Sequence, residues 1–586
     1  MRVFAAMLLS VSLAAVPLLA NDAKDAGKEE SPAKAVAERA KETTKPENAV
    51  IESELQDLRS LVQSQMQELE SQRAALKAQQ LKMEALEERL HSAPSEPVST
   101  AVTTPAAISV ESPVAAISAT PRTLSASVAT PAQGAAEEKP SPLYFKIGAA
   151  EFYPLGFMDM MGVYRTTNLG GIGTSFGSIA FNNTLPTGRL SEFRFSAQNS
   201  RIGLRTHAKF GEADVTGYLE ADFLGFLPPN GDITSNSNSL RTRLYWVDYR
   251  RGKIEFLGGQ SWSFLTPNRT GLGALPGELF YSQDVDTNYQ LGLTWARQTS
   301  FRVILHPTDS WAIGVSIENP QQTLPSSVIL PPGVSPGYAT SNNLPQLDTN
   351  SGNTSNAVAV NNPNVPNLYP DVIAKTAFDF KPGGHQVHFD FAGLYRTFKV
   401  VDLLQTTSAA NTVTNTIHGG GAAATANVEV VKNFRLIATG FYSYAGGRYI
   451  ASTGGPDVIV RADGRLSGVH SGSAIGGFEY QPNPKTVIYG YYSGAYFNKN
   501  TGLAGAGTVP NIGYGNPAAA SSSANRFIYE PTFGIHYMMW RNPNYGDLRL
   551  MTQYSYVSRT PWVVATGTPS TAHLSMVYID LRYDLP

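Results

Sequence analysis

Residues 201–210 carry apolar or small side chains at every second position and mainly charged side chains between them. A two-residue turn at 211–212 follows, and residues 213–223 repeat the alternation with acidic side chains on the polar side. A period of two on both arms of a tight turn predicts a β-hairpin. One such hairpin would fit a soluble β-sandwich as well as a membrane barrel.

The alternation recurs along the chain, and this repetition separates the two classes. In residues 577–585 apolar side chains at the odd positions alternate with polar side chains at the even ones, and residues 387–396 and 548–556 alternate in the same way. Strands with one apolar and one polar face, behind an N-terminal export signal, are typical of a transmembrane β-barrel. We therefore predict an all-β, porin-type transmembrane barrel.

From about residue 152 onward the pattern predicts sixteen antiparallel strands. The count is even when residues 289–305 form one long strand, and both ends of the barrel then lie on the side of the short turns. Short turns are expected near residues 211, 252, 306–310, 381–384, 432–433, 481–485 and 541–546. Long loops are expected at residues 168–192, 224–239, 263–288, 319–370, 399–423, 446–469, 498–525 and 559–571. Because bacterial barrels place short turns in the periplasm, the N-terminal segments are expected there.

Two places break the alternation. Arg297 falls on the apolar side of its strand, and Phe193 and Phe195 share the phase of Arg201. A β-bulge, or a position at the barrel rim above the bilayer, would explain each case. The sequence does not choose between these explanations.

The first 50 residues have no barrel pattern. Residues 1–20 resemble a secretory signal peptide, with Arg2 before an apolar run and a small residue at Ala20. A short buried helix is the alternative. Residues 21–50 are rich in Ala, Lys and Glu without a core pattern, which predicts a disordered segment.

Residues 51–91 change to apolar spacings of three and four, which predicts a coiled coil. Gln65, Gln72 and Gln79 occupy successive layers of its seam, where amides of neighbouring helices can hydrogen-bond and fix the register. We favour a parallel oligomer over a single solvated helix. Residues 92–142 are rich in Pro, Ala, Ser and Thr, and predict an extended linker to a barrel at residues 143–586.

The composition agrees with a barrel and argues against other classes. The 586 residues include 27 Tyr and 52 Gly, only 16% are charged, and none is Cys. A net charge of −2 gives no basic excess for binding nucleic acid, and the lack of cysteine excludes disulfides and thiolate catalysis. No apolar run of about 18 residues follows the N-terminal segment, so no transmembrane helix is expected.

The sequence lacks enzyme signatures. It has no Gly-x-Ser-x-Gly elbow and no His-Glu-x-x-His, and the glycine clusters at 170–173 and 419–421 lack the strand–helix setting of a nucleotide site. His385 and His388 flank a turn, and we interpret them as turn residues, not as a metal site. We therefore expect no catalytic residue, no metal and no cofactor.

A sixteen-stranded barrel encloses a water-filled channel, so its inward residues decide what passes. Strand phase places a basic stripe, an acidic row and two more distant arginines on the inward face. These candidate pore-lining residues are Arg201, Arg205, His207, Lys209, Asp214, Glu220, Asp222, Arg241, Arg243, Arg396 and Arg549. Opposed rows of charge would set up a field that orients a dipolar or anionic solute. Alternatively, the rows form cross-strand ion pairs that stabilise the wall.

Two long loops carry expectations of their own. Residues 263–288 are long enough to fold into the lumen as a constriction, and an ordinary external loop fits the sequence equally well. Residues 319–370, rich in Asn, Pro and Ser, are expected to form an external loop or one that latches a trimer.

Short motifs add a resemblance to a known family. They are Ser191-Glu192-Phe193-Arg194-Phe195, the run 218–223, Gly259-Gln260-Ser261-Trp262-Ser263 and the run 316–320. With the order of signal, coiled coil, linker and barrel, residues 51–586 resemble the DcaP-like trimeric outer-membrane porins. The resemblance implies a homotrimer, a periplasmic coiled coil and diffusion of small, often anionic solutes such as dicarboxylates. The ending Tyr583-Asp584-Leu585-Pro586 departs from the terminal aromatic residue of many outer-membrane barrels.

The sequence thus favours a passive porin, not an enzyme, in the bacterial outer membrane. Its expected partners are further copies of itself, through the barrel wall and the coiled coil, outer-membrane lipid and small anionic solutes, but no nucleic acid. One alternative is a structural tether, in which a plugged barrel anchors the coiled coil and links the membrane to the cell wall. Another is an uptake channel specific for a sugar or a phosphate.

Overall fold

The computed structural model describes residues 142–586, apart from 170–171, 174, 184–186, 226–235, 237, 276–278, 286–289, 333, 337–345, 348–367, 404–411 and 518–522. The expected signal peptide, disordered segment and coiled coil, and all of the linker before residue 142, lie outside the described residues. They stay predictions.

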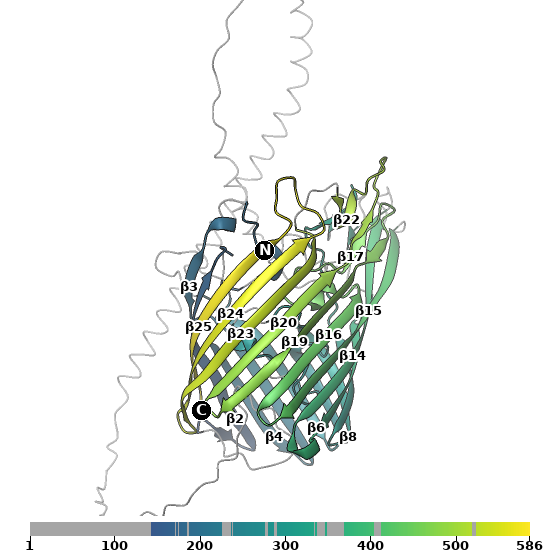
Figure 1. Cartoon of the computed structure of the whole chain (residues 1–586). Helices are drawn as coiled ribbons and strands as arrows, with labels where there is room; N and C mark the ends of the chain where they lie inside the picture. The colour runs from purple at the N-terminus through teal and green to yellow at the C-terminus, as the bar shows by residue number, and fades with distance from the viewer. Residues whose placement is uncertain are drawn as a thin grey trace, which may run out of the picture. The chain divides into compact units, whose positions relative to one another are not determined.

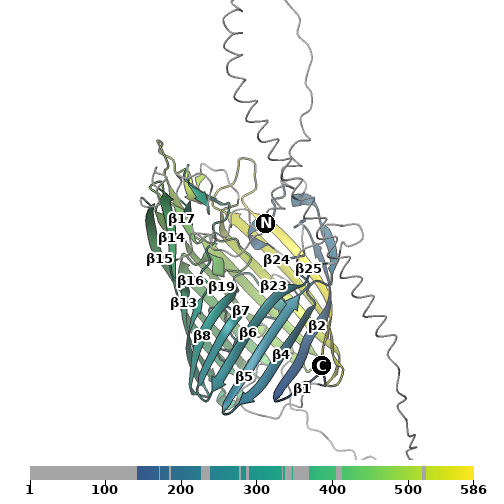
Figure 2. The same cartoon turned by 180° about the vertical axis from the view of Figure 1, so that it is seen from behind.

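Sixteen strands of the described part form the wall of a closed barrel (Figures 1 and 2). Each pairs antiparallel with the next, and β2 closes the barrel by pairing with β25, from Phe157 opposite Asp584 to Arg165 opposite Met576. The wall strands are β2 (Ala150–Arg165), β4 (Arg201–Phe210), β5 (Ala213–Asp222), β6 (Arg241–Arg251), β7 (Ile254–Trp262), β8 (Arg297–Thr308), β9 (Trp311–Glu318), β13 (Asp371–Phe380), β14 (Val387–Leu403), β15 (Thr412–Val431), β16 (Phe434–Tyr444), β19 (His470–Asn483), β20 (Thr486–Phe497), β23 (Asn525–Asn542), β24 (Gly546–Pro561) and β25 (Ala572–Asp584).

Shorter elements complete the described structure. The main sheet also contains β1 (Phe145–Ile147), β3 (Glu192–Ser196), β11 (Ser335–Pro336) and β12 (Gln346–Leu347). Two small sheets are β10 (Val328–Ile329) with β22 (Ile512–Tyr514) and β21 (Asn500–Gly502), and β17 (Val458–Val460) with β18 (Leu466–Gly468). The short helices are η1 (Phe176–Ser178), η2 (Thr187–Arg189), α5 (Ser282–Val285), η3 (Pro382–Gly384) and η5 (Gly447–Tyr449).

Burial along the wall strands is the reverse of that in a soluble protein. On β25 the outward Val577 and Ile579 are 51% and 50% exposed, whereas the inward Asp580 and Arg582 are 0% and 1% exposed. Strand β24 alternates in the same way. A sheet with apolar side chains outside and charges inside suits a bilayer around it and polar groups within. This alternation confirms the predicted phase of the hairpin and of the C-terminal strand.

No helix among the described residues is long and apolar enough to cross a membrane.

The lumen near the long-loop ends of the strands is filled by a hydrophobic core. Phe176, from the loop between β2 and β4, and Tyr449 and Ile459, from the loop between β16 and β19, are fully buried there. They belong to one cluster with Val163 of β2 and Val400 of β14, inward residues near the long-loop ends of their strands. The half of the lumen at the long-loop ends of the strands is therefore packed by loops that fold inward.

The seven predicted short turns are confirmed, and seven of the eight predicted long loops lie between the expected wall strands, with ends that differ by up to eight residues. The loop predicted at 399–423 is wrong, because β14 continues to Leu403 and β15 begins at Thr412. Residues 412–417 are rich in β-branched side chains, which favour a strand, and they pair with the extended end of β14.

The long strand predicted at 289–305 is also wrong, because β8 begins only at Arg297. Residues 290–296 instead extend the preceding loop, where their polar groups find partners across the lumen. The main-chain N–H of Leu291, for example, donates to Glu530 of β23 at 2.9 Å. Strand period alone could not reveal these partners.

Both breaks in the alternation have a structural cause. Residues 197–200 interrupt the strand between β3 and β4, so Phe193 and Phe195 point outward while Arg201 is buried. Residues 197–200 lie opposite 158–160 of β2 and so add one residue, which is a bulge, one of the two explanations that the sequence left open. Arg297 is the first residue of β8 and pairs with Trp262, the last residue of β7, so it lies at the rim.

Candidate pore and its lumen loop

Residues 263–296, here called the lumen loop, cross the inside of the barrel. At one end Ala274 packs into a cluster with Tyr218 of β5 and Trp246 of β6. Farther along, Leu279 and Phe280 pack into a cluster with residues of β16, β19 and β20, on the other side of the sixteen-stranded wall. The predicted constriction loop therefore folds into the lumen, and it is eight residues longer than expected, ending at 296 instead of 288.

Ion pairs anchor the first part of the lumen loop. The Arg269 guanidinium donates to both carboxylate oxygens of Glu479 on β19, at 2.9 and 2.6 Å. Burial alone would lower the pKa of Arg269, but the Glu479 charge outweighs it and raises this pKa. Burial, with the same carboxylate, raises the pKa of Tyr281 to about 12. Both side chains therefore keep their protons over the whole physiological pH range.

A buried lysine fixes the turn that follows Thr266. Lys375 of β13 donates from Nζ to the carbonyl of Thr266 at 2.7 Å and to Oδ1 of Asn268 at 2.8 Å. Asp390 of β14 lies 3.4 Å from Nζ and accepts the N–H of Asn268 at 3.1 Å. The loop backbone is thus part of the hydrogen-bond network of the wall.

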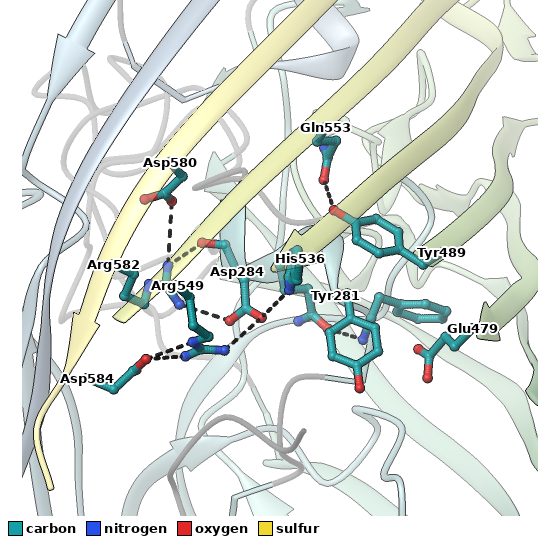
Figure 3. A network of polar contacts seen from close by, with 12 residues as sticks. Tyr281, Asp284, Glu479, Tyr489, His536, Arg549, Gln553, Asp580, Arg582 and Asp584 are labelled. Carbon is teal, nitrogen blue, oxygen red and sulfur yellow. Dashed lines mark hydrogen bonds and ion pairs between the residues drawn. The ribbon is translucent and has the colours of Figure 1, made fainter. Parts of the chain in front are cut away.

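Helix α5 carries the second anchor (Figure 3). Its Asp284 accepts from Nη1 of Arg582 on β25 at 2.9 Å. Nδ1 of His536 on β23 lies 3.6 Å, and Nη1 of Arg549 on β24 lies 3.9 Å, from the other Asp284 carboxylate oxygen. Three neighbouring wall strands thus surround one carboxylate of the lumen loop.

The predicted basic stripe on β4 lies on the inward face of its strand. Arg201 is buried over the Phe157 ring at 5.0 Å, and half-buried Arg205 lies over the Tyr153 ring at 4.8 Å. Nε2 of His207 lies 3.1 Å from a carboxylate oxygen of Asp214 on β5, and its Nδ1 lies 3.7 Å from a carboxylate oxygen of Glu151 on β2. Lys209, near the short-turn end, is exposed.

The acidic row on β5 is bound to arginines of β6. Asp222 accepts two hydrogen bonds from Arg241, at 2.9 and 2.7 Å, and one from Arg243 at 2.7 Å. Arg243 also donates to Glu220 at 2.5 Å, and the Tyr218 hydroxyl donates to the same carboxylate at 2.9 Å. These contacts are cross-strand ion pairs, the second of the two arrangements that the sequence left open.

The two distant candidates, Arg396 and Arg549, lie in other networks. Arg396 is 1% exposed and forms ion pairs with Asp371 and Asp457, each at 3.0 Å. Because Asp457 belongs to the loop between β16 and β19, Arg396 binds that loop to the wall. Arg549 donates to Asp584 at 2.7 Å and lies beside Asp284 of the lumen loop.

Sequence reasoning left out the carboxylates that hold the lumen loop. Glu479 and Glu530 have the inward phase of β19 and β23, so the alternation could have found them. Asp284 could not be found in this way. It lies in an irregular segment, and its partner Arg582 follows 298 residues later.

We compared the sequence and the fold with those of known proteins. No protein-family model matches the sequence, and no curated protein sequence matches it. The structure of the outer-membrane channel DcaP of Acinetobacter baumannii is similar over 75% of this chain and 99% of that chain, with a TM-score of 0.52 at 16% identity. This chain has the fold of the DcaP channel. The resemblance found in the sequence motifs is thereby confirmed at the level of the fold.

Two other porin structures are similar at TM-scores too low to carry an argument. The anion-selective porin from Comamonas acidovorans has a TM-score of 0.39 at 10% identity, covering 74% of this chain and 100% of that one. OprB of Pseudomonas putida has a TM-score of 0.39 at 11% identity, covering 74% of this chain and 94% of that one. At these identities a likeness concerns the fold alone.

Proposed function

We propose that the chain is an outer-membrane porin through which small hydrophilic solutes diffuse passively, with a preference for anions such as dicarboxylates. It acts as a homotrimer, joined through the barrel wall and the coiled coil, with no cofactor and no catalytic step. The N-terminal segments lie in the periplasm, and the long loops face the outside.

The observation that carries this proposal is the closed sixteen-stranded wall with apolar residues outside and charged residues inside. A sheet of this size encloses more space than its own inward side chains fill. Its remaining interior is crossed by the lumen loop, whose anchors are charged groups of the wall. Such a constriction selects solutes by size and charge.

The anion preference is supported by the basic residues that reach solvent on β4. Half-buried Arg205 and exposed Lys209 share the inward face there, near the short-turn end. Arg241 and Arg243, in contrast, are engaged by Asp222. Arg205 and Lys209 are therefore the residues that we assign to anion attraction.

Purified protein in a planar bilayer tests the proposal. We expect stepwise conductance in groups of three and a reversal potential, in a salt gradient, that indicates anion preference. The double variant Arg205→Gln and Lys209→Gln should reduce this preference by about half. Arg465→Gln, which removes an exposed charge from an external turn, should leave it unchanged. A protein without conductance would refute the porin function.

The alternative of a plugged barrel that tethers the membrane to the cell wall has one observation in its favour. The half of the lumen at the long-loop ends is packed by inward-folded loops, and Phe264, Leu265 and Val285 of the lumen loop belong to the same hydrophobic cluster. The same bilayer experiment separates the two functions, because a tether needs no conductance. A channel specific for a sugar or phosphate would be blocked by micromolar solute.

A further inference from the structure

Arg582 on the inward face of β25 contacts two carboxylates from different parts of the chain. Its Nε and Nη2 donate to one oxygen of Asp159 on β2, at 2.9 and 2.7 Å. Its Nη1 donates to Asp284 of the lumen loop at 2.9 Å, and Nη2 also donates to the Asp284 carbonyl. This single guanidinium joins the loop to the wall.

A third carboxylate, that of Asp580, lies within reach of the same guanidinium (Figure 3). Asp580 stands two residues before Arg582 on the same face of β25, and its carboxylate lies 3.9 Å from Nη2. Its side chain is 0% exposed, and neither of its oxygens accepts a hydrogen bond from any described residue. A buried carboxyl group without a donor is costly, and the Arg582 guanidinium is the cation beside it that could donate to Asp580.

Arginine cannot satisfy all three carboxylates at once. Its N–H groups form a rigid planar fork, and both hydrogens of Nη2, the nitrogen that lies 3.9 Å from Asp580, already donate to Asp159 and to the Asp284 carbonyl. A movement of about 1 Å would bring Nη2 to hydrogen-bonding distance of Asp580. The same movement would draw the guanidinium away from Asp284. Asp284 would then keep the longer contacts to His536 and Arg549, at 3.6 and 3.9 Å.

We propose that Arg582 is a two-position latch that positions the lumen loop. Bound to Asp159 and Asp284, it holds α5 in the lumen. Turned toward Asp580, it releases Asp284, and the loop moves away from β25 and widens the passage. The inference deepens the proposed porin function, on which its consequence for conductance rests.

Two isosteric substitutions should act in opposite directions. Asp284→Asn removes the charge that holds the loop, so the channel should spend roughly fivefold more time in its larger-conductance state. Asp580→Asn removes the alternative acceptor, so visits to that state should fall by roughly fivefold. Asp547→Asn is the matched control, because it removes a carboxylate from β24 that pairs with Arg541 instead.

A second readout follows the loop without any conductance. The chain has no cysteine, so Ser282→Cys places a single thiol on α5, at a side chain that is fully buried. In lipid vesicles, Asp284→Asn should speed maleimide labelling of this thiol, and Asp580→Asn should slow it, each relative to Ser282→Cys alone.

The two readouts separate failure of the latch from failure of the porin function. Labelling that changes in opposite directions, in a protein without conductance, would support the latch and refute the porin. Conductance with equal effects of Asp284→Asn and Asp580→Asn, or with none, would overturn the latch. An effect of Asp547→Asn as large as theirs would also overturn it, because any lost carboxylate would then suffice.

Discussion

At the scale of single residues, the lumen is a set of matched charges. Inward arginines and lysines meet carboxylates of neighbouring strands or loops, as Arg243 meets Glu220 and Asp222 and Lys375 meets Asp390. Such buried pairs contribute little net stability when intact. The loss of one partner, however, leaves the other as a buried charge without compensation, which is destabilising. A residue can therefore be essential for the wall without touching solute.

Arg243→Ala tests this distinction. Because Glu220 and Asp222 are both buried, removal of the arginine should destabilise the barrel by about 3–5 kcal/mol. Arg205→Ala, at a half-buried site over Tyr153, should cost less than about 1 kcal/mol. Urea unfolding in detergent, followed by circular dichroism, measures both. Equal losses of unfolding free energy in the two variants would show that the ion pairs between β5 and β6 do not stabilise the barrel.

At the scale of the element, each wall strand has two faces with separate roles. Its outward positions are apolar for the bilayer, and its inward positions supply the groups that bind loops. On β25, Ile579 and Asp580 are neighbours in sequence and face opposite sides. Since strand period is two, a shift of register by one residue would place charges in lipid.

The free-energy cost of a charge on the outward face should depend on the depth of that position in the bilayer. Ile579→Arg, in the middle of β25, should destabilise the barrel by about 2–4 kcal/mol. Ser575→Arg, outward on the same strand near its long-loop end, should cost about 0–1 kcal/mol. The measurement is reversible unfolding of the two variants in lipid vesicles. A larger cost at residue 575 would contradict the assigned membrane position.

At the scale of the whole molecule, the described barrel and the predicted N-terminal segments have separable roles. The wall closes on itself through β2 and β25, and among the described residues each wall strand pairs with two neighbouring wall strands. The heptads of residues 51–91, in contrast, predict contact with other copies of the chain.

Deletion of residues 21–90 should therefore leave the conductance of each pore unchanged within about 10%. Because the predicted coiled coil would raise the effective concentration of linked barrels, the proposed trimer should dissociate at lower temperature in this variant. Planar-bilayer recordings and the mobility of the heated protein on gels measure the two effects. Loss of conductance in the deletion variant would show that the N-terminal segment is part of the channel.

The sequence by itself determined the fold class, the number of wall strands and the side on which the short turns lie. These properties are local, because a period of two and a turn motif can be read within ten or twenty residues. The alternation also predicted the inward phase of the charged residues on β4 and β5, whereas the pairing of Arg243 with Glu220 and Asp222 beside a bulge came only from the structure.

Only the tertiary structure decided what those inward residues do. Whether Arg396 faces water or Asp457, and whether residues 290–296 form a strand or bind Glu530, depends on segments that lie far away in the sequence. The position of Asp284 beside Arg582 likewise exists only once the wall has closed. Alternation specifies which way a side chain points, but the closed barrel determines which partner it meets there.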